Sequence, residues 1–327
     1  EFNKVYDILG IEFDSFTGES FYSDKMPKVV EELQNKGLLV KSEGADIVDL
    51  EPYNMPPALI RKSDGSTLYI TRDIAAAIYR KEHYDFYKNI YVVGSEQKLH
   101  FDQWRKIIDL MGYDWAENCI HVPFGMVSLE DGTMSTRKGR VVFLEDVLKK
   151  AVEKTTGIIE ERNPNLENKE EVAKQVGIGA IVFQELFNSR IKDYVFSWDK
   201  TLSFEGETGP YVQYTHARAN SLLEKGKFSV EDEIDYSLLK REEEIDIIRL
   251  LYDFPNIIVN SSENNEPYFI TRHITEIAKN FNRFYHNCPI LNEEEDLRKA
   301  RLHLVYATKL VLNTGLLLLG IEAPDKM

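Results

Sequence analysis

The sequence has few cysteines and no long apolar run. Its 327 residues include only Cys119 and Cys288, which lie far apart without metal-ligand spacing, so a disulfide framework is excluded. The longest uncharged apolar run, from Leu310 to Ile321, is interrupted by polar residues and is too short to span a bilayer. No basic and apolar segment of the signal-peptide type opens the chain. We therefore expect a cytoplasmic protein without membrane contact.

Positive charge is also scarce. The chain has 40 Lys and Arg against 55 Asp and Glu, for a net charge of −15 at pH 7. This balance argues against a protein that coats nucleic acid without sequence preference, although a local basic patch can still recognise RNA. With 43% hydrophobic and 29% charged residues, the composition is typical of a globular protein, and the length indicates about two domains.

Strand and helix patterns alternate over the first part of the chain. A short strand at 90–93 ends in Gly94, a helix follows at 99–111, and a second strand at 119–124 ends in Gly125. This is the pattern of a parallel βαβ unit. Upstream we expect a helix at 26–37, a hairpin with arms at 58–62 and 67–70, and a helix at 73–84, capped by Thr71 or Asp73.

Strand signals fade after Val142. Helices are expected at 144–155 and 170–188, with a break at Asn163-Pro164-Asn165. Nearly everything from Gly209 onward has helical spacing, including 271–285 and 297–319. The fold class is therefore α/β followed by all-α.

Ligands of open α/β sheets bind beyond the carboxyl ends of the strands. Three segments are expected there, namely Tyr69–Asp73, Gly94–Gln97 and Phe124–Val127, and the loop Gly132–Gly139 follows the third. They offer acids, a tyrosine, an amide and a cationic loop on one rim. This combination suits a small cationic substrate beside a polyphosphate.

Each of these signals is weak alone. Asp73 could only cap a helix, and Tyr69 could be a packed strand tyrosine with its hydroxyl at the surface. Gln97 and His100 could be ordinary polar residues of a first helical turn, and the Arg137-Lys138 pair could be solvated. Their coincidence at strand ends favours a site.

A series of stretches points, in order, to one family: Glu19–Tyr22, Lys62–Gly65, Tyr69–Ala75, Tyr91–Gln97 with His100, Phe124–Val127, Met134–Gly139, Thr208–Tyr214 with His216–Arg218, and Leu319–Met327. With them the chain resembles the C-terminal portion of bacterial-type arginyl-tRNA synthetases, which are class I aminoacyl-tRNA synthetases. The resemblance implies a partial Rossmann-like catalytic domain at 1–149, a helical connecting segment at 150–211, and a DALR-type anticodon-binding domain at 212–327.

The resemblance also implies the reaction and its partners. ATP, with Mg²⁺, would activate L-arginine to arginyl-adenylate for transfer to tRNA(Arg), without a tightly bound metal and in a monomeric complete enzyme. Tyr69 and Asp73 would hold the guanidinium, which pairs well with a carboxylate, and Gln97 would add a further contact. The residues implied to contact ATP are His100, Phe124, Gly125, Met126 and Val127.

The loop at 132–139 resembles the class I signature Lys-Met-Ser-Lys-Ser. The implied catalytic residues are Met134, Ser135, Thr136, Arg137 and Lys138. Threonines stand in place of both signature lysines, so Arg137 or Lys138 would have to neutralise the pyrophosphate. The flanking glycines allow the loop to close.

The sequence contains no His-x-Gly-His motif, which the class also needs. We therefore expect a portion that starts inside the catalytic domain and cannot carry out the reaction alone. A non-catalytic tRNA-binding protein built from synthetase parts is the alternative. Cysteinyl-tRNA synthetase also carries a DALR-type domain, but it needs a zinc site that two remote cysteines do not supply.

Overall fold

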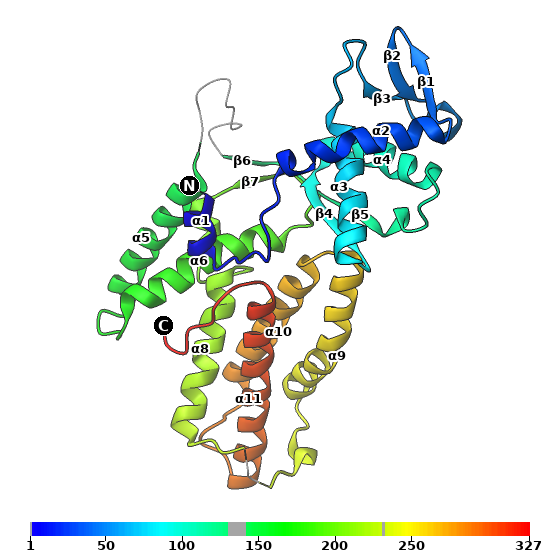
Figure 1. Ribbon diagram of the computed structural model, residues 1–327. Helices are drawn as coiled ribbons and strands as arrows, with labels where there is room; N and C mark the ends of the chain where they lie inside the picture. Colours follow the sequence, from blue (N-terminus) through cyan, green and yellow to red (C-terminus); the bar gives the residue numbers. More distant parts are fainter. Residues whose placement is uncertain (1, 130–141, 231–232) are drawn as a thin grey trace. The chain divides into compact units, whose positions relative to one another are not determined.

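Figure 1 shows the computed structural model, which describes residues 2–129, 142–230 and 233–327. The chain forms two compact units. We call Phe13–Met126 the mixed unit, and Glu1–Glu12 together with Val127–Met327 the helical unit.

The mixed unit contains two small sheets and three α-helices. Strands β1 (Leu39–Ser42), β2 (Ala45–Val48) and β3 (Ala58–Arg61) form an antiparallel sheet, while β4 (Asn89–Gly94) pairs in parallel with β5 (Cys119–Phe124). The helices are α2 (Met26–Asn35), α3 (Tyr69–Tyr84) and α4 (Lys98–Leu110), and the short 3-10 helices are η1 (Glu19–Lys25), η2 (Glu51–Tyr53), η3 (Ser95–Gln97) and η4 (Ala116–Asn118).

One apolar core holds the mixed unit together. Helix α4 buries Phe101, Trp104, Ile107 and Ile108 on one face, at the spacing of an amphipathic helix. Helix α3 contributes Ile70, Ile74, Ala75 and Ala77 to the same core. The predicted β4–α4–β5 unit is confirmed, since the two strands run parallel with Asn89 opposite Cys119.

The predicted hairpin at 58–62 and 67–70 is wrong in its second arm. The turn forms, with Gly65 at φ +84° and the Ser66 amide donating to Asp64, but only a single bridge joins Arg61 to Thr67. The chain then enters α3 at Tyr69, because Ile70 and Ile74 must face the core on one side of a helix. Leu68 occupies the N-cap position, so neither Thr71 nor Asp73 caps this helix.

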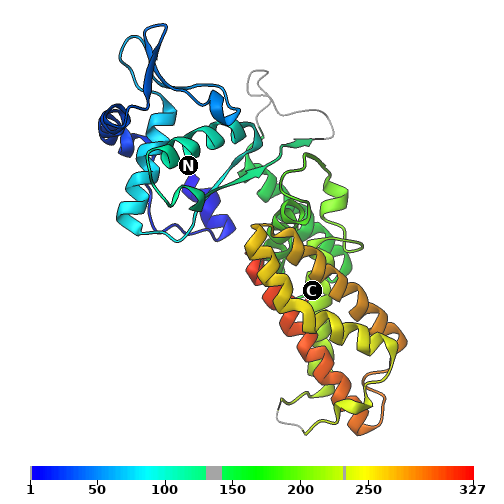
Figure 2. The same ribbon diagram turned by 90° about the vertical axis from the view of Figure 1, so that its right-hand side faces the viewer.

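The helical unit is built mainly of helices, most of them long. They are α1 (Phe2–Leu9), α5 (Leu144–Arg162), α6 (Lys169–Phe187), α7 (Trp198–Thr201), α8 (Gly209–Gly226), α9 (Glu242–Asn264), α10 (Tyr268–Asn287) and α11 (Glu295–Leu318), with the 3-10 helix η6 (Tyr236–Leu238). Figure 2 shows α9, α10 and α11, coloured yellow to red, packed as a bundle. The predicted helices at 170–188, 271–285 and 297–319 are confirmed with small changes in their ends, whereas the helix predicted at 144–155 continues to Arg162, just before the predicted break at 163–165. In addition, β6 (Val127–Leu129) pairs in parallel with β7 (Tyr194–Phe196), which the sequence did not reveal.

None of the described helices is long and apolar enough to cross a membrane.

Candidate functional site

The carboxyl ends of β4 and β5 lie side by side. Gly94 is the register partner of Phe124, so the segments 94–97 and 124–126 leave the sheet next to each other, as expected for parallel neighbours. Phe124, the last residue of β5, and Met126, two residues beyond it, are both exposed. Val127 begins β6 and belongs to the helical unit.

Tyr69 and Asp73 reach this region from a helix, which corrects their expected place at a strand end. They stand four residues apart in the first turns of α3, and residues at this spacing share a helix face. Thr71 lies between them, buried, and its hydroxyl donates to the carbonyl of Ile60 at 2.9 Å. That bond ties the start of α3 to strand β3.

Asp73 is paired with His100. Its Oδ2 lies 2.5 Å from Nε2 of the imidazole, and since a carboxylate only accepts, Nε2–H is the donor. The Asp73 side chain is 40% exposed, whereas that of His100 is 9% exposed. The carboxylate is therefore held from its buried side and open to ligands on the other.

Tyr69 completes this cluster. Its ring centroid lies 4.6 Å from that of His100, with the planes tilted by 47°, and the residue is 58% exposed. Gln97 is also exposed, in the 3-10 helix that leads into α4, three residues before His100. The structure thus brings Tyr69, Asp73 and His100 into contact and places Gln97 just upstream on the His100 segment.

The candidate catalytic residues Met134, Ser135, Thr136, Arg137 and Lys138 lie outside the described residues. In the described part of the chain, no group of three or more His, Cys, Asp or Glu is arranged to hold a metal ion.

A second candidate site lies in the helical unit, and sequence reasoning assigned no roles there. A cavity of about 590 Å³ is lined by residues from α5, α8, α10 and the C-terminus, among them Tyr211, Tyr214, Arg218, His286 and Met327. A neighbouring cavity of about 560 Å³ shares Tyr214, Arg218 and Met327. The signal available in the sequence was the spacing of Tyr211, Tyr214 and Arg218, which fits one face of a helix.

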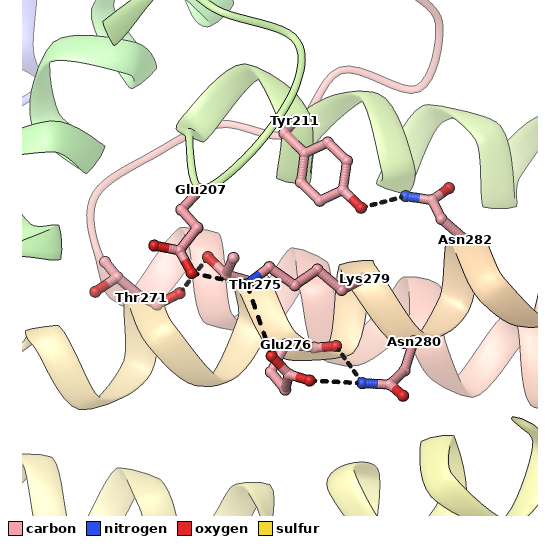
Figure 3. A network of polar contacts seen from close by, with 8 residues as sticks. All are labelled: Glu207, Tyr211, Thr271, Thr275, Glu276, Lys279, Asn280 and Asn282. Atoms are coloured by element: carbon pink, nitrogen blue, oxygen red, sulfur yellow. Dashed lines mark hydrogen bonds and ion pairs between the residues drawn. The ribbon is translucent and has the colours of Figure 1, made fainter. Parts of the chain in front are cut away.

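Arg218 is the centre of this second site. Its guanidinium lies 4.8 Å from the ring centroid of Tyr214 and 4.9 Å from that of Tyr285, and it donates to Oδ1 of Asn282. Asn282 in turn donates from Nδ2 to the hydroxyl of Tyr211 at 2.9 Å (Figure 3). In this cavity, hydrogen bonds through Asn282 orient the Arg218 guanidinium and the Tyr211 ring, and the Tyr214 ring lies against the guanidinium.

The loop before α8 is attached to α10 beside this cavity. Glu207 pairs with Nζ of Lys279 at 2.7 Å, and Lys279 also lies 3.9 Å from Glu276 (Figure 3). The bond to Glu207 raises the pKa of Lys279, so the lysine stays charged at neutral pH.

Polar residues on another face of α8 hold the C-terminal tail. Gln213 donates to the carbonyl of Glu322 at 2.7 Å, His216 to that of Pro324 at 3.1 Å, and Asn220 to that of Asp325 at 3.2 Å. Gly179 on α6 leaves the space for Gln213, since a Cβ there would lie 2.8 Å from Nε2. These bonds bring the last residue, Met327, to the wall of the cavity.

Comparison with known proteins identifies two family domains along the chain. Residues 1–198 match the model of the catalytic domain of class I (R) tRNA synthetases, and residues 212–327 match the DALR anticodon binding domain. The expected order of an α/β class I domain and a helical DALR-type domain is thereby confirmed.

Similar proteins are found by sequence and by structure. The whole chain is 69% identical to an arginine–tRNA ligase of Halothermothrix orenii and 62% identical to one of Clostridioides difficile, and it spans 58% of the length of each. The Thermus thermophilus arginyl-tRNA synthetase structure superposes with a TM-score of 0.91 at 27% identity, over 99% of this chain and 62% of that one.

Proposed function

Because this chain belongs to the class I (R) tRNA synthetase family, we propose that it is the part of an arginine–tRNA ligase that binds arginine and reads the anticodon. The proposed reaction consumes ATP, with Mg²⁺, to form arginyl-adenylate, and then transfers arginine to tRNA(Arg). The observation that carries this proposal is the half-exposed Asp73 carboxylate, held by buried His100 and flanked by Tyr69.

Asp73 is the proposed partner of the substrate guanidinium. A guanidinium is planar and permanently charged, and it binds a carboxylate through parallel hydrogen bonds. Tyr69, one helical turn earlier on α3, supplies a hydroxyl, and exposed Gln97 supplies an amide for a further contact. Phe124, Gly125, Met126 and Val127 are the proposed contacts of the adenosine of ATP.

The proposed catalytic loop contains Met134, Ser135, Thr136, Arg137 and Lys138. In this proposal Arg137 or Lys138 meets the negative charge that develops on the pyrophosphate leaving group. Since the sequence contains no His-x-Gly-His motif, these 327 residues by themselves are not expected to complete the reaction.

The cavity around Arg218 is the proposed site for bases of the anticodon loop. Unstacked RNA bases bind by stacking on aromatic rings and on arginine, and this cavity offers Tyr211, Tyr214 and Arg218 in fixed positions.

The domain division at 1–149, 150–211 and 212–327 belongs to the same proposal. The alternative is a non-catalytic tRNA-binding protein. Such a protein would use the cavity around Arg218 to bind RNA and would not need the catalytic loop at 132–139.

Calorimetric titration with arginine, lysine and citrulline tests the proposal. We expect arginine to bind and the other two to bind much more weakly, because neither presents a charged planar group. Protein expressed from its complete reading frame that binds tRNA but shows no arginine binding would favour the alternative.

A further inference from the structure

The contact between Asp73 and His100 joins residues on two different helices. The side chains meet at 2.5 Å although 27 residues separate them in the chain. His100 lies in the first turn of α4, directly after the segment that leaves the carboxyl end of β4. From the first turn of α4, the imidazole of His100 therefore holds the carboxylate of Asp73 on α3.

Burial differs sharply between the two partners. The His100 side chain is 9% exposed, and its ring contacts those of Tyr69, at 4.6 Å, and Phe101, at 5.8 Å. These ring contacts and the bond from Nε2–H to Asp73 hold the imidazole in place. The carboxylate, 40% exposed, keeps lone pairs free for a ligand.

We propose that His100 is a positioning residue for arginine, which acts by fixing the carboxylate plane of Asp73. This assignment rests on the proposed function and takes the place of the adenosine contact that the family resemblance implies for His100. A carboxylate offers about four lone-pair sites. The single bond from Nε2–H uses one on Oδ2, so Oδ1 and the rest of Oδ2 are left for the two parallel N–H groups of a guanidinium.

His121 provides a matched control within the same core. Its ring stacks on Phe101 at 4.1 Å, and its Nε2 bonds with the carbonyl of Val93 at 3.0 Å. His121 is thus a half-buried histidine that shares the ring partner Phe101 with His100. Its hydrogen bond goes to the backbone carbonyl of Val93, whereas that of His100 goes to the Asp73 carboxylate.

The test is arginine-dependent ATP–pyrophosphate exchange, measured with tRNA(Arg) present, by protein expressed from its complete reading frame. His100→Phe keeps the ring packing and removes the donor, whereas His100→Gln places an amide N–H near the position of Nε2. We expect His100→Phe to raise the KM for arginine about tenfold, the factor for a lost charge-assisted hydrogen bond, and the KM for ATP less than about twofold. His100→Gln should recover most of the loss, and His121→Phe should leave both KM values within about twofold of wild type.

Other outcomes would overturn the assignment. A raised KM for ATP with an unchanged KM for arginine would make His100 a nucleotide contact. Equal damage by His100→Phe and His100→Gln, with thermal midpoints as low as each other, would reduce His100 to a packing residue. Wild-type protein without arginine-dependent exchange would overturn the proposed function itself, and this assignment with it.

Discussion

His216 on α8 donates from Nδ1 to the carbonyl oxygen of Pro324, 3.1 Å away and 108 residues later in the chain. The residue is buried, and burial lowers the pKa of its imidazole. Nearby Lys309 acts in the same direction, while Asp325 and the bond to Pro324 oppose it. Burial therefore favours the neutral imidazole at this contact with the C-terminal tail.

This neutral histidine predicts a pH dependence of stability. Because the folded pKa lies below the unfolded value, the unfolded chain binds the proton more readily. The contribution is fully present above about pH 6.5, the unfolded value, and is lost as the pH falls through the folded pKa. We expect a chemical-denaturation midpoint that declines from pH 7 towards pH 5 (roughly the window below the unfolded pKa), and declines less in His216→Asn, which keeps a donor near Nδ1. Equal slopes for the two proteins would exclude His216 as the titrating group.

Asp73 is predicted to determine arginine affinity. Asp73→Asn should cost about 2–4 kcal/mol in arginine binding, because a charged hydrogen-bonded pair is broken. Tyr69→Phe should cost about 1 kcal/mol, since one neutral hydrogen bond is lost. Calorimetric titration of the protein expressed from its complete reading frame measures both. Unchanged arginine affinity in Asp73→Asn would leave that carboxylate without a role in substrate binding.

The loop cations are predicted to act on the rate. Single changes Arg137→Ala and Lys138→Ala should slow adenylate formation more than they weaken arginine binding, because the charge they meet grows in the transition state. ATP–pyrophosphate exchange at saturating arginine, beside calorimetric titration with arginine, separates the two effects. If both variants exchange at the wild-type rate, a cation elsewhere in the enzyme neutralises the pyrophosphate.

Arg218 is predicted to contribute to tRNA affinity. Arg218→Ala should weaken binding of tRNA(Arg) by about 1–3 kcal/mol, the effect of removing a stacking partner from a base. Arg249→Ala, which removes an arginine whose side chain is 75% exposed on α9, is the control for loss of charge alone. Filter binding at fixed salt measures both, and equal losses would show that only net charge matters.

The 327-residue chain alone is predicted to show no measurable arginine-dependent pyrophosphate exchange. Of the two elements that the proposed function places beside the reacting phosphate, the His-x-Gly-His motif is absent from its sequence. Loss of positioning and electrostatic groups slows a reaction by several powers of ten. The double variant Lys138→Ala/Asp73→Asn, prepared in parallel, detects contaminating host enzyme. Exchange by the wild-type chain well above that background would contradict the prediction.

Local patterns in the sequence determined much of the architecture. The β4–α4–β5 unit and the helices of the helical unit follow from periodicity and from glycine and proline breaks, which act over a few residues. The short strands β1 and β2 escaped notice, and so did the pairing of β6 with β7, because Val127 and Tyr194 are distant in the chain. Residues 67–70 have the pattern of a strand, so the sequence predicted the second arm of a hairpin there. In the structure Tyr69 and Ile70 belong to helix α3, which buries Ile70 against the core.

The candidate sites divide in the same way. The sequence by itself selected Tyr69, Asp73, Gln97 and His100, through their place in ordered motifs. Only the tertiary structure decided that His100 holds Asp73, because that contact depends on how α3 packs against α4. Met327 likewise lines the cavity around Arg218 only through the fold, because the C-terminal tail is hydrogen-bonded to α8. Hydrogen bonds between residues a hundred positions apart leave no periodic trace in a sequence.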